Sequence, residues 1–195
     1  MGPMSAIDRL RAERLVVILR RVDGVDARVE MLAAAGVGVI EITLDSDDAL
    51  GAIRRARARG DVSVLAGTVR TAAQVDAAVD VGAEAVVGPA FSAAVLERAR
   101  ELGVPAIPGA LTPTEVETAW AAGAALVKLF PGGLGGPGYV RDLLAPLADV
   151  SLLVTGGVDA SNARAFLDAG AVAVGAGSSI RDGAAARAIV AAVLR

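Results

Sequence analysis

The sequence predicts an α/β fold, a (β/α)8 TIM barrel with a short N-terminal helix, and two periodic features indicate it. Glycines that follow helical patterns recur about 20 to 24 residues apart, with one double step before the last, at Gly36, Gly60, Gly82, Gly103, Gly123 and Gly170. Eight short apolar runs alternate along the chain with eight amphipathic patterns. Short continuous apolar runs are typical of parallel strands covered by helices, and their even spacing favours a closed barrel over a doubly wound sheet.

The individual elements follow from this alternation in chain order. A leading helix, residues 6–14, is expected to cover the bottom of the barrel. The expected strands are residues 15–19, 37–43, 62–66, 85–87, 105–107, 125–129, 151–154 and 171–174. The expected helices are residues 26–35, 47–59, 71–81, 92–102, 113–122, 139–147, 162–169 and 183–194. Each marker glycine fits a helix end, where a left-handed φ costs glycine little.

Several of these helices have recognisable starts. Residues that commonly cap helix N-termini precede the helical patterns at Asp47, Thr71, Ser92, Thr112 and Ser161. The segment TPTE at 112–115 is a capping box with proline at the first helical position. Helix starts are therefore expected at these residues.

Composition bounds the chemistry available to the chain. At 195 residues with 54% apolar side chains, the chain suits one domain, residues 1–195, with a substantial core. The absence of cysteine excludes disulfides and thiol chemistry. Because histidine is also absent, proton transfer near neutral pH falls to a carboxylate, a lysine or water.

Charge and hydropathy limit the partners. The net charge of -3 argues against nucleic-acid binding. No uncharged apolar stretch reaches the roughly 20 residues that a membrane-spanning helix needs, and residues 1–10 lack the apolar core of a signal peptide. We therefore expect a cytoplasmic protein that binds neither membranes nor nucleic acid.

One apolar run, residues 124–131, contains a lysine in its middle. Lys128 is the only lysine of the chain, since every other basic side chain is arginine. Burying an ammonium among leucine, valine and phenylalanine costs several kcal/mol unless the group is paired or loses its proton. Burial thus favours the uncharged amine, which is a nucleophile and, unlike a guanidinium, forms imines.

A second isolated charge stands in another apolar strand. Glu41 lies in the second expected strand and Lys128 in the sixth. In a barrel, alternate strands contribute to the same interior layer, so these two side chains are expected to meet at the mouth. A buried structural salt bridge is the alternative explanation for the pair. Thr68, at the end of the third strand, is weaker evidence because such a threonine often only caps the next helix.

Glycine clusters follow the last two expected strands. TGG at 155–157 and GAGSS at 175–179 lie where exposed backbone N–H groups of such barrels commonly bind phosphate, with plain tight turns as the alternative. A third glycine-rich stretch, residues 132–138, starts no periodic helix directly. We expect it to form a flexible loop over the site, with phosphate contact as the lesser alternative.

Together these segments resemble the KDPG/KHG aldolase family, class I enzymes that act on 2-keto-3-deoxy-6-phosphogluconate and on 4-hydroxy-2-oxoglutarate. The resemblance extends from about Leu15 to Ile180 and keeps the family's order. Its motifs are VILR at 17–20, IEIT at 40–43, AGTV at 66–69, GP at 88–89, IPG at 107–109, TPTE at 112–115, VKLFP at 127–131, TGGV at 155–158 and GAGS at 175–178.

The resemblance implies a reaction and a set of site residues. It implies Schiff-base chemistry at Lys128 and acid–base catalysis at Glu41, with no metal or cofactor, a small 2-keto acid as substrate, and a homotrimer. Substrate contacts are implied for Arg20, Thr43, Thr68, Pro89, Phe130 and Thr155. Of these, Arg20 and Thr68 would contact the keto-acid carboxylate. Phosphate contacts are implied for Gly156, Gly157, Gly177 and Ser178. The products would be pyruvate with glyceraldehyde 3-phosphate or with glyoxylate.

One residue departs from the family pattern. Many members have an arginine two residues after the threonine of the Glu-x-Thr motif, whereas this chain has Asp45 there. An acidic side chain does not help to bind a carboxylate, so Arg20 and backbone amides would carry that role. Some relatives that act on the galactonate isomer also lack this arginine, which makes 2-keto-3-deoxy-6-phosphogalactonate the alternative substrate.

Three other functions remain open at this level. A metal-dependent class II lyase would need paired carboxylates at the strand ends beyond Glu41. A phosphate-binding barrel synthase, similar to thiamine-phosphate synthase, would share the glycine loops but would not need Lys128. A barrel without catalytic activity, serving as an oligomerisation scaffold, would form no Schiff base with pyruvate.

Overall fold

A computed structural model describes residues 4–194, and within them strands and helices alternate as the sequence predicts. The strands are β1 Leu15–Leu19, β2 Val39–Thr43, β3 Ser63–Gly67, β4 Ala85–Val87, β5 Ala106–Ile107, β6 Gly109–Ala110, β7 Val127–Leu129, β8 Leu152–Thr155 and β9 Ala173–Ala176. The helices are α1 Ala6–Glu13, α2 Val25–Ala34, α3 Ala49–Arg59, α4 Ala72–Asp80, α5 Ala93–Glu101, α6 Pro113–Ala121, the 3-10 helix η1 Gly132–Leu134, α7 Gly136–Leu144, α8 Ala163–Asp168 and α9 Gly183–Val193.

The strands form one parallel sheet in the order β5-β4-β3-β2-β1-β9-β8-β7-β6. Its two ends, β5 and β6, are separated only by Pro108; β5 lies within the expected fifth strand, residues 105–107, and β6 follows it as an additional piece. The first piece pairs with β4 and the second with β7. Because proline has no backbone N–H, the strand changes partner there, and the Pro108 carbonyl accepts a hydrogen bond from the Lys128 N–H. The predicted barrel fold is confirmed, and among residues 4–194 β6 is added to the eight expected strands.

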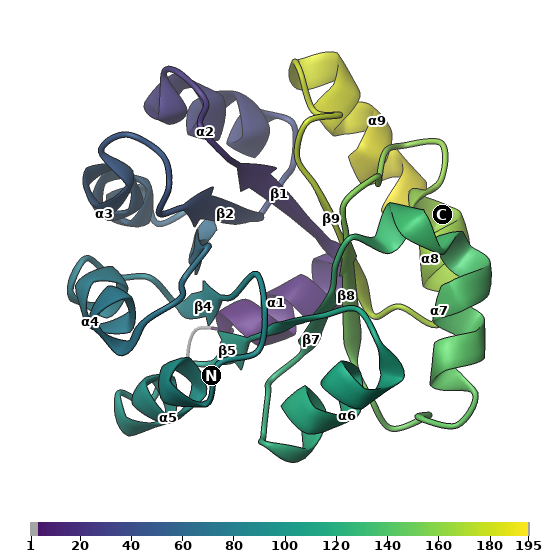
Figure 1. Cartoon of the computed structure of the whole chain (residues 1–195). Coiled ribbons are helices and arrows are strands. Elements are labelled where there is room, and N and C mark those ends of the chain that lie inside the picture. Colours follow the sequence, from purple (N-terminus) through teal and green to yellow (C-terminus); the bar gives the residue numbers. More distant parts are fainter. Residues whose placement is uncertain (1–3, 195) are drawn as a thin grey trace.

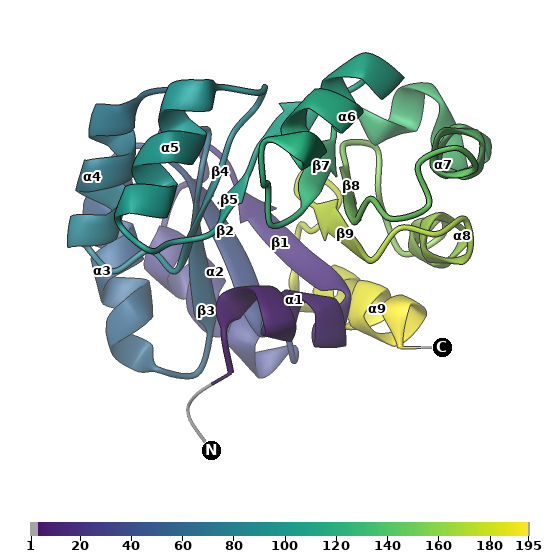
Figure 2. The same ribbon diagram turned by 90° about the horizontal axis from the view of Figure 1, so that it is seen from below.

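Two apolar layers hold the barrel together. One lies between the strands and the ring of helices α2–α9, which surrounds the sheet in Figure 1. The other fills the barrel interior and includes Ala6 and Leu10 of α1 together with Val39, Leu126 and Leu153. Helix α1 lies across one end of the barrel rather than in the ring (Figure 2), which confirms the predicted cover.

The helix ends confirm most of the predicted signals. Each of the six marker glycines has a left-handed φ, between 70° and 111°. Thr71, Ser92 and Thr112 cap their helices as predicted, and the Thr112–Glu115 capping box is present. Two predicted caps are wrong. Helix α3 is preceded by Asp48 instead of Asp47, and Ser161 hydrogen-bonds Asp159 rather than the α8 backbone.

The predicted loop at residues 132–138 is wrong. This segment forms η1 and the first turn of α7, because proline is tolerated there and glycine permits close packing. The Gly133 N–H donates to the Gly156 carbonyl at 2.8 Å, so the segment packs against the turn after β8.

Two expectations concern the membrane and the chain start. Among residues 4–194, no helix has the length and apolar character required to cross a bilayer. The expectation that residues 1–10 carry no signal peptide falls partly on residues 1–3, which lie outside the described residues.

Candidate active site

The two isolated charges of the apolar strands meet inside the barrel. Alternation along a strand places Glu41 on the same face as Val39, and Lys128 on the same face as Leu126. Lys128 Nζ lies 3.5 Å from Glu41 Oε1, and the two side chains are 4% and 0% exposed. The predicted meeting of these residues is therefore confirmed.

The Glu41 carboxylate is otherwise unsupported. Within residues 4–194, neither of its oxygens has a hydrogen-bond partner. A Cβ atom added at Gly67, on the neighbouring strand β3, would collide with Glu41 Oε1. Glycine at this position thus leaves the room in which the carboxylate lies. A buried carboxylate with free lone pairs can accept a proton from whatever lies against it.

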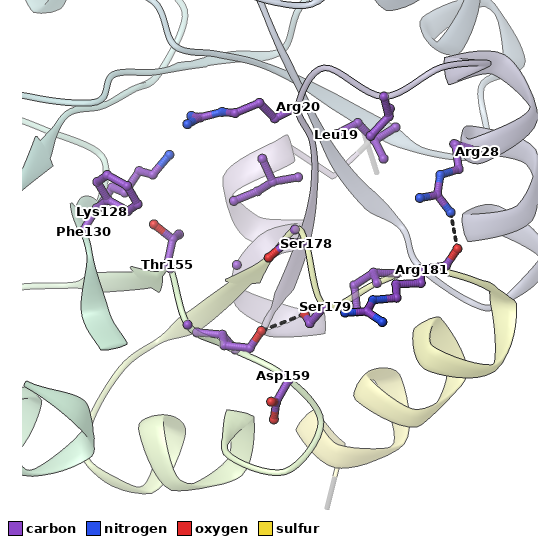
Figure 3. A pocket seen from close by; sticks show the side chains of 18 residues that line it. Leu19, Arg20, Arg28, Lys128, Phe130, Thr155, Asp159, Ser178, Ser179 and Arg181 are labelled. Carbon is purple, nitrogen blue, oxygen red and sulfur yellow. Dashed lines mark hydrogen bonds between the residues drawn. The ribbon is translucent and has the colours of Figure 1, made fainter. Parts of the chain in front are cut away.

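A cavity of about 590 Å³ opens above the Lys128 side chain. Figure 3 shows Lys128, Phe130 and Thr155 together at one end of it. Lys128 Nζ is 5.7 Å from the centre of the Phe130 ring. The Thr155 hydroxyl is buried and has no hydrogen-bond partner among the described residues, so it is available to a bound molecule. A Cβ at Gly175 would lie 2.6 Å from the Thr155 methyl group, so glycine is needed there to seat Thr155.

Arg20 reaches over the same end of the cavity from the end of β1 (Figure 3). Its Nη2 lies 3.1 Å from Thr68 Oγ1, and its Nε lies 4.0 Å from Asp45 Oδ1. Asp45 Oδ2 also lies 3.2 Å from Arg21 Nε. Burial opposes ionisation of Asp45, but hydrogen bonding and the charges of Arg20 and Arg21 outweigh it, so the pKa of Asp45 lies below its ordinary value. Asp45 is thus an anion beside the predicted carboxylate ligand.

Four predicted site residues do not line this cavity: Glu41, Thr43, Thr68 and Pro89. Glu41 lies against Lys128 in the barrel interior, and Thr68 contacts Arg20. The Thr43 hydroxyl is buried, donates to the Leu19 carbonyl at 3.3 Å and lies 3.2 Å from Ser46 Oγ. Its polar group is therefore already used by the protein.

The predicted phosphate-binding residues all line the cavity. Gly156 and Gly157 have left-handed φ values of 84° and 77°, which L-residues with side chains seldom adopt. Asn162 Nδ2 donates to the Gly157 carbonyl at 2.8 Å and so holds this turn. Gly177 and Ser178 lie in the loop after β9, where Ser179 Oγ donates to the Val158 carbonyl at 2.8 Å. The two loops are thereby fixed to each other.

Sequence reasoning missed three polar residues of the lining: Arg28, Asp159 and Arg181. Asp159 and Arg181 lie two residues after the glycine motifs at 155–157 and 175–179, so their proximity to these motifs was a usable signal. Arg28 carries no such signal, because it lies on α2 and reaches the cavity only through the packing of the barrel.

Residues 4–194 contain no group of three or more histidine, cysteine, aspartate or glutamate side chains placed to hold a metal ion.

Comparison with known proteins matches this geometry. The sequence model of the family described as "KDPG and KHG aldolase" matches residues 7–191. A 2-dehydro-3-deoxy-phosphogluconate aldolase of Haemophilus influenzae is 36% identical over 165 residues, covering 83% of this chain and 78% of the relative. A 2-dehydro-3-deoxy-6-phosphogalactonate aldolase of Escherichia coli (strain K12) is 36% identical over 173 residues, covering 85% of this chain and 83% of the relative.

A solved structure shows the same likeness in three dimensions. It is described as a "4-hydroxy-2-oxoglutarate aldolase/2-deydro-3-deoxyphosphogluconate aldolase from TTHB1". Its TM-score is 0.87 at 31% identity, and the match covers 98% of this chain and 100% of that one. The sequence-based predictions of a barrel, of a carbon–carbon lyase and of its family are confirmed. The chain belongs to the KDPG and KHG aldolase family.

Proposed function

We propose that the protein is a metal-independent class I aldolase that releases pyruvate from a 2-keto-3-deoxy sugar acid or a related 4-hydroxy-2-keto acid. The first candidate reactions are cleavage of 2-keto-3-deoxy-6-phosphogluconate to pyruvate and glyceraldehyde 3-phosphate, and of 4-hydroxy-2-oxoglutarate to pyruvate and glyoxylate. The observation that carries the proposal is the buried amine of Lys128, 3.5 Å from the otherwise unpartnered carboxylate of Glu41 and facing a cavity.

The reaction begins at Lys128. Lys128 Nζ passes a proton to Glu41 and, as the free amine, attacks the C2 ketone to give a carbinolamine; loss of water, with that proton returned to the departing hydroxyl, gives an iminium. Glu41 Oε1, next to Nζ, is placed to exchange the protons of these two steps. The iminium then accepts the electron pair of the C3–C4 bond as that bond breaks. The aldehyde leaves and an enamine remains on Lys128.

Proton transfer completes the cycle. The C4 hydroxyl loses its proton as the aldehyde forms, and the enamine gains one at C3. We assign both transfers to Glu41, the first through a water molecule, because Glu41 lies behind Lys128 and outside the cavity lining. Hydrolysis of the resulting iminium frees pyruvate and restores the amine.

The other predicted residues hold the substrate. Arg20 takes the keto-acid carboxylate with Thr68 beside it, and Phe130 and Thr155 flank the reacting carbons. The phosphate is assigned to Gly156, Gly157, Gly177 and Ser178, whose backbone surrounds the cavity. Direct substrate contact by Thr43 and Pro89 stays a prediction.

A second candidate substrate is the galactonate isomer, 2-keto-3-deoxy-6-phosphogalactonate. Asp45 favours it, because this anion stands beside Arg20 where many family members have an arginine. The relative of that name is 36% identical, the same value as the phosphogluconate enzyme. The two isomers differ at C4, the carbon whose hydroxyl Glu41 would deprotonate.

Four further properties are part of the proposal. Residues 1–195 act as one domain, the protein works in the cytoplasm, and it assembles as a homotrimer. No cofactor takes part. Sedimentation equilibrium of the purified protein tests the trimer, and a monomer with full activity contradicts it.

Side-by-side cleavage assays test the function. The three substrates are incubated with the protein with and without EDTA, and pyruvate is measured with lactate dehydrogenase. We expect pyruvate from at least one phosphorylated substrate and no effect of EDTA. A barrel synthase or an inactive scaffold would release no pyruvate from any of them, and a class II lyase would lose its activity in EDTA.

A further inference from the structure

The charges that line the cavity are unevenly paired. At the end near Phe130, each cation has an anionic neighbour, because Lys128 faces Glu41 and Arg20 faces Asp45. At the other end lie Arg28 and Arg181, which form no ion pair with any carboxylate of residues 4–194 within 4.0 Å. Figure 3 shows these two arginines at the end opposite Lys128. Positive charge is therefore uncompensated at one end only.

Asp159 is the one acidic residue of the lining, and it does not neutralise this end. Its carboxylate accepts hydrogen bonds from the Ser161 N–H at 2.8 Å and from the Ser161 hydroxyl. These bonds hold the pKa of Asp159 below its ordinary value. In Figure 3 its side chain points away from the cavity. Asp159 thus supports the turn rather than pairing with an arginine.

Arg28 and Arg181 are also connected to each other. Arg28 Nη1 donates a hydrogen bond to the Arg181 main-chain carbonyl (Figure 3). This bond ties α2 to the loop that carries Gly177 and Ser178. Arg28 is half-buried, and partial shielding from water strengthens the interaction of a charged group with an anion. Arg28 therefore combines a fixed position with unpaired charge, and Arg181 adds a second unpaired charge beside it.

We propose that Arg28 and Arg181 are specificity-determining residues that select substrates with a phosphate on the end distal to the keto group. This inference rests on the proposed aldolase function. A phosphate dianion forms charge-assisted, often bidentate, hydrogen bonds with guanidinium groups. The short dicarboxylate 4-hydroxy-2-oxoglutarate carries only a carboxylate at that end. A phosphate carries more negative charge and one more acceptor oxygen than a carboxylate, so two unpaired arginines favour the phosphorylated sugar acids.

The test compares Arg28→Gln, Arg181→Gln and the double variant with the unchanged protein. Each variant is assayed for cleavage of whichever phosphorylated substrate the unchanged protein cleaves. We expect kcat/KM to fall about tenfold for each arginine, mostly through KM, as for the loss of one charge-assisted hydrogen bond. Inorganic phosphate should inhibit the unchanged protein competitively, and about tenfold more should be needed for the variants. Arg54→Gln is the control for loss of one positive charge, because Arg54 is exposed on α3 away from the cavity.

A second readout removes the phosphate from the reaction. Exchange of the methyl protons of pyruvate with D₂O needs the Schiff base but no phosphate contact. We expect this exchange to change less than about twofold in both single variants, since no charge-assisted bond to phosphate is involved. Equal losses in exchange and cleavage, or an unchanged KM for the phosphorylated substrate, overturn the proposal.

Two features keep the test decisive. If Arg28→Gln fails to fold because the bond to the Arg181 carbonyl is lost, Arg181→Gln still tests the proposal, since the Arg181 side chain is exposed. Failure of the aldolase function itself has a different signature, because the unchanged protein would then show no pyruvate exchange at all.

Discussion

The barrel interior contains two layers of side chains that come from the same strands two residues apart, and they differ completely in chemistry. The layer nearer α1 is apolar and almost fully buried, with Val16, Val39, Leu65, Leu126, Leu153 and Ala173. Two residues further along these strands lie Ile18, Glu41, Gly67, Lys128, Thr155 and Gly175. The first layer stabilises the fold, whereas the second holds a buried ion pair and an unpartnered hydroxyl.

Each of these strands contributes one residue to the apolar layer and one to the polar layer. A step of two residues keeps a side chain on the same face of a strand, so the polar layer is positioned by the apolar one beneath it. The apolar layer can be close-packed because it needs no reactive group. The polar layer contains glycine where bulk would displace the Glu41 carboxylate or Thr155. Substitutions in the two layers should therefore have separable effects on activity and stability.

The largest effect is expected from removing the amine. Lys128→Met should lower kcat by on the order of 10⁴-fold or more, because no imine can form. It should also destabilise the fold by about 3–5 kcal/mol, since Glu41 is left buried and unpaired. Steady-state pyruvate release and urea unfolding measure the two effects.

A matched double variant separates chemistry from structure. Lys128→Met with Glu41→Gln removes both charges and should recover much of the lost stability, but none of the activity. If the double variant is active, the pair is only a structural salt bridge.

Glu41→Gln alone comes next in size. The amide keeps the shape of the side chain but cannot take up a proton, so kcat should fall about 10²- to 10⁴-fold. Binding of pyruvate, followed by borohydride trapping at long incubation, should persist. A variant with unchanged kcat would assign the proton transfers to another group.

Leu153→Ala, in the apolar layer, should lower stability much more than activity. Leu153 is fully buried, and its truncation should cost about 2–5 kcal/mol of unfolding free energy. The kcat per folded molecule should fall far less than in Lys128→Met, because Leu153, the register partner of Lys128 across β7 and β8, carries no group that reacts. Urea unfolding and active-site titration check this, and a large fall in kcat without loss of stability would break the division between the layers.

Gly67→Ala should produce a smaller effect in the polar layer. The added methyl group would collide with Glu41 Oε1 and push the carboxylate from Lys128, so activity should fall about tenfold. Ala66→Gly, on the opposite face of β3, is the control for the change in backbone freedom. Equal activity of Gly67→Ala and the unchanged protein would show that Glu41 does not need its present position.

Asp45→Asn tests the carboxylate beside Arg20 and Arg21, and its expected effect on stability is the smallest. The pKa of Asp45 is lower in the folded protein than in the unfolded chain. Its charged form therefore stabilises the fold at every pH above the unfolded-state pKa. This stabilisation is lost as the pH falls through the lower folded-state pKa. The variant should therefore be less stable than the unchanged protein at neutral pH, by about 1 kcal/mol or less, and equally stable in strong acid. Thermal unfolding across this pH range measures it, and a difference that grows in acid has the wrong sign.

Much of the site was predictable because its residues break a local pattern. Lys128 and Glu41 are isolated charges in apolar strands, and the barrel symmetry then places them together. The glycine turns after β8 and β9 were predictable from their spacing. These features depend on periodicity along one strand and on the order of strands.

Other features depend on packing between elements and could not be predicted from the sequence. Pro108 separates β5, which pairs with β4, from β6, which pairs with β7, and the apolar run at 105–107 does not reveal this change of partner. The stretch 132–138 has a loop-like composition, yet its glycines let it pack against Gly156 and Gly157. Arg28 reaches the cavity from a helix whose pattern indicates only a core-facing side and a solvent-facing side.

Borohydride reduction in the presence of pyruvate tests the central claim most directly. Lys128 is the only lysine, so peptide mass spectrometry distinguishes its adduct from one on the N-terminal amine. We predict one pyruvyl group on the peptide that contains Lys128, and none on that peptide in Lys128→Met. No adduct, or an adduct confined to the N-terminal amine, would contradict the assignment of Lys128 as the Schiff-base residue.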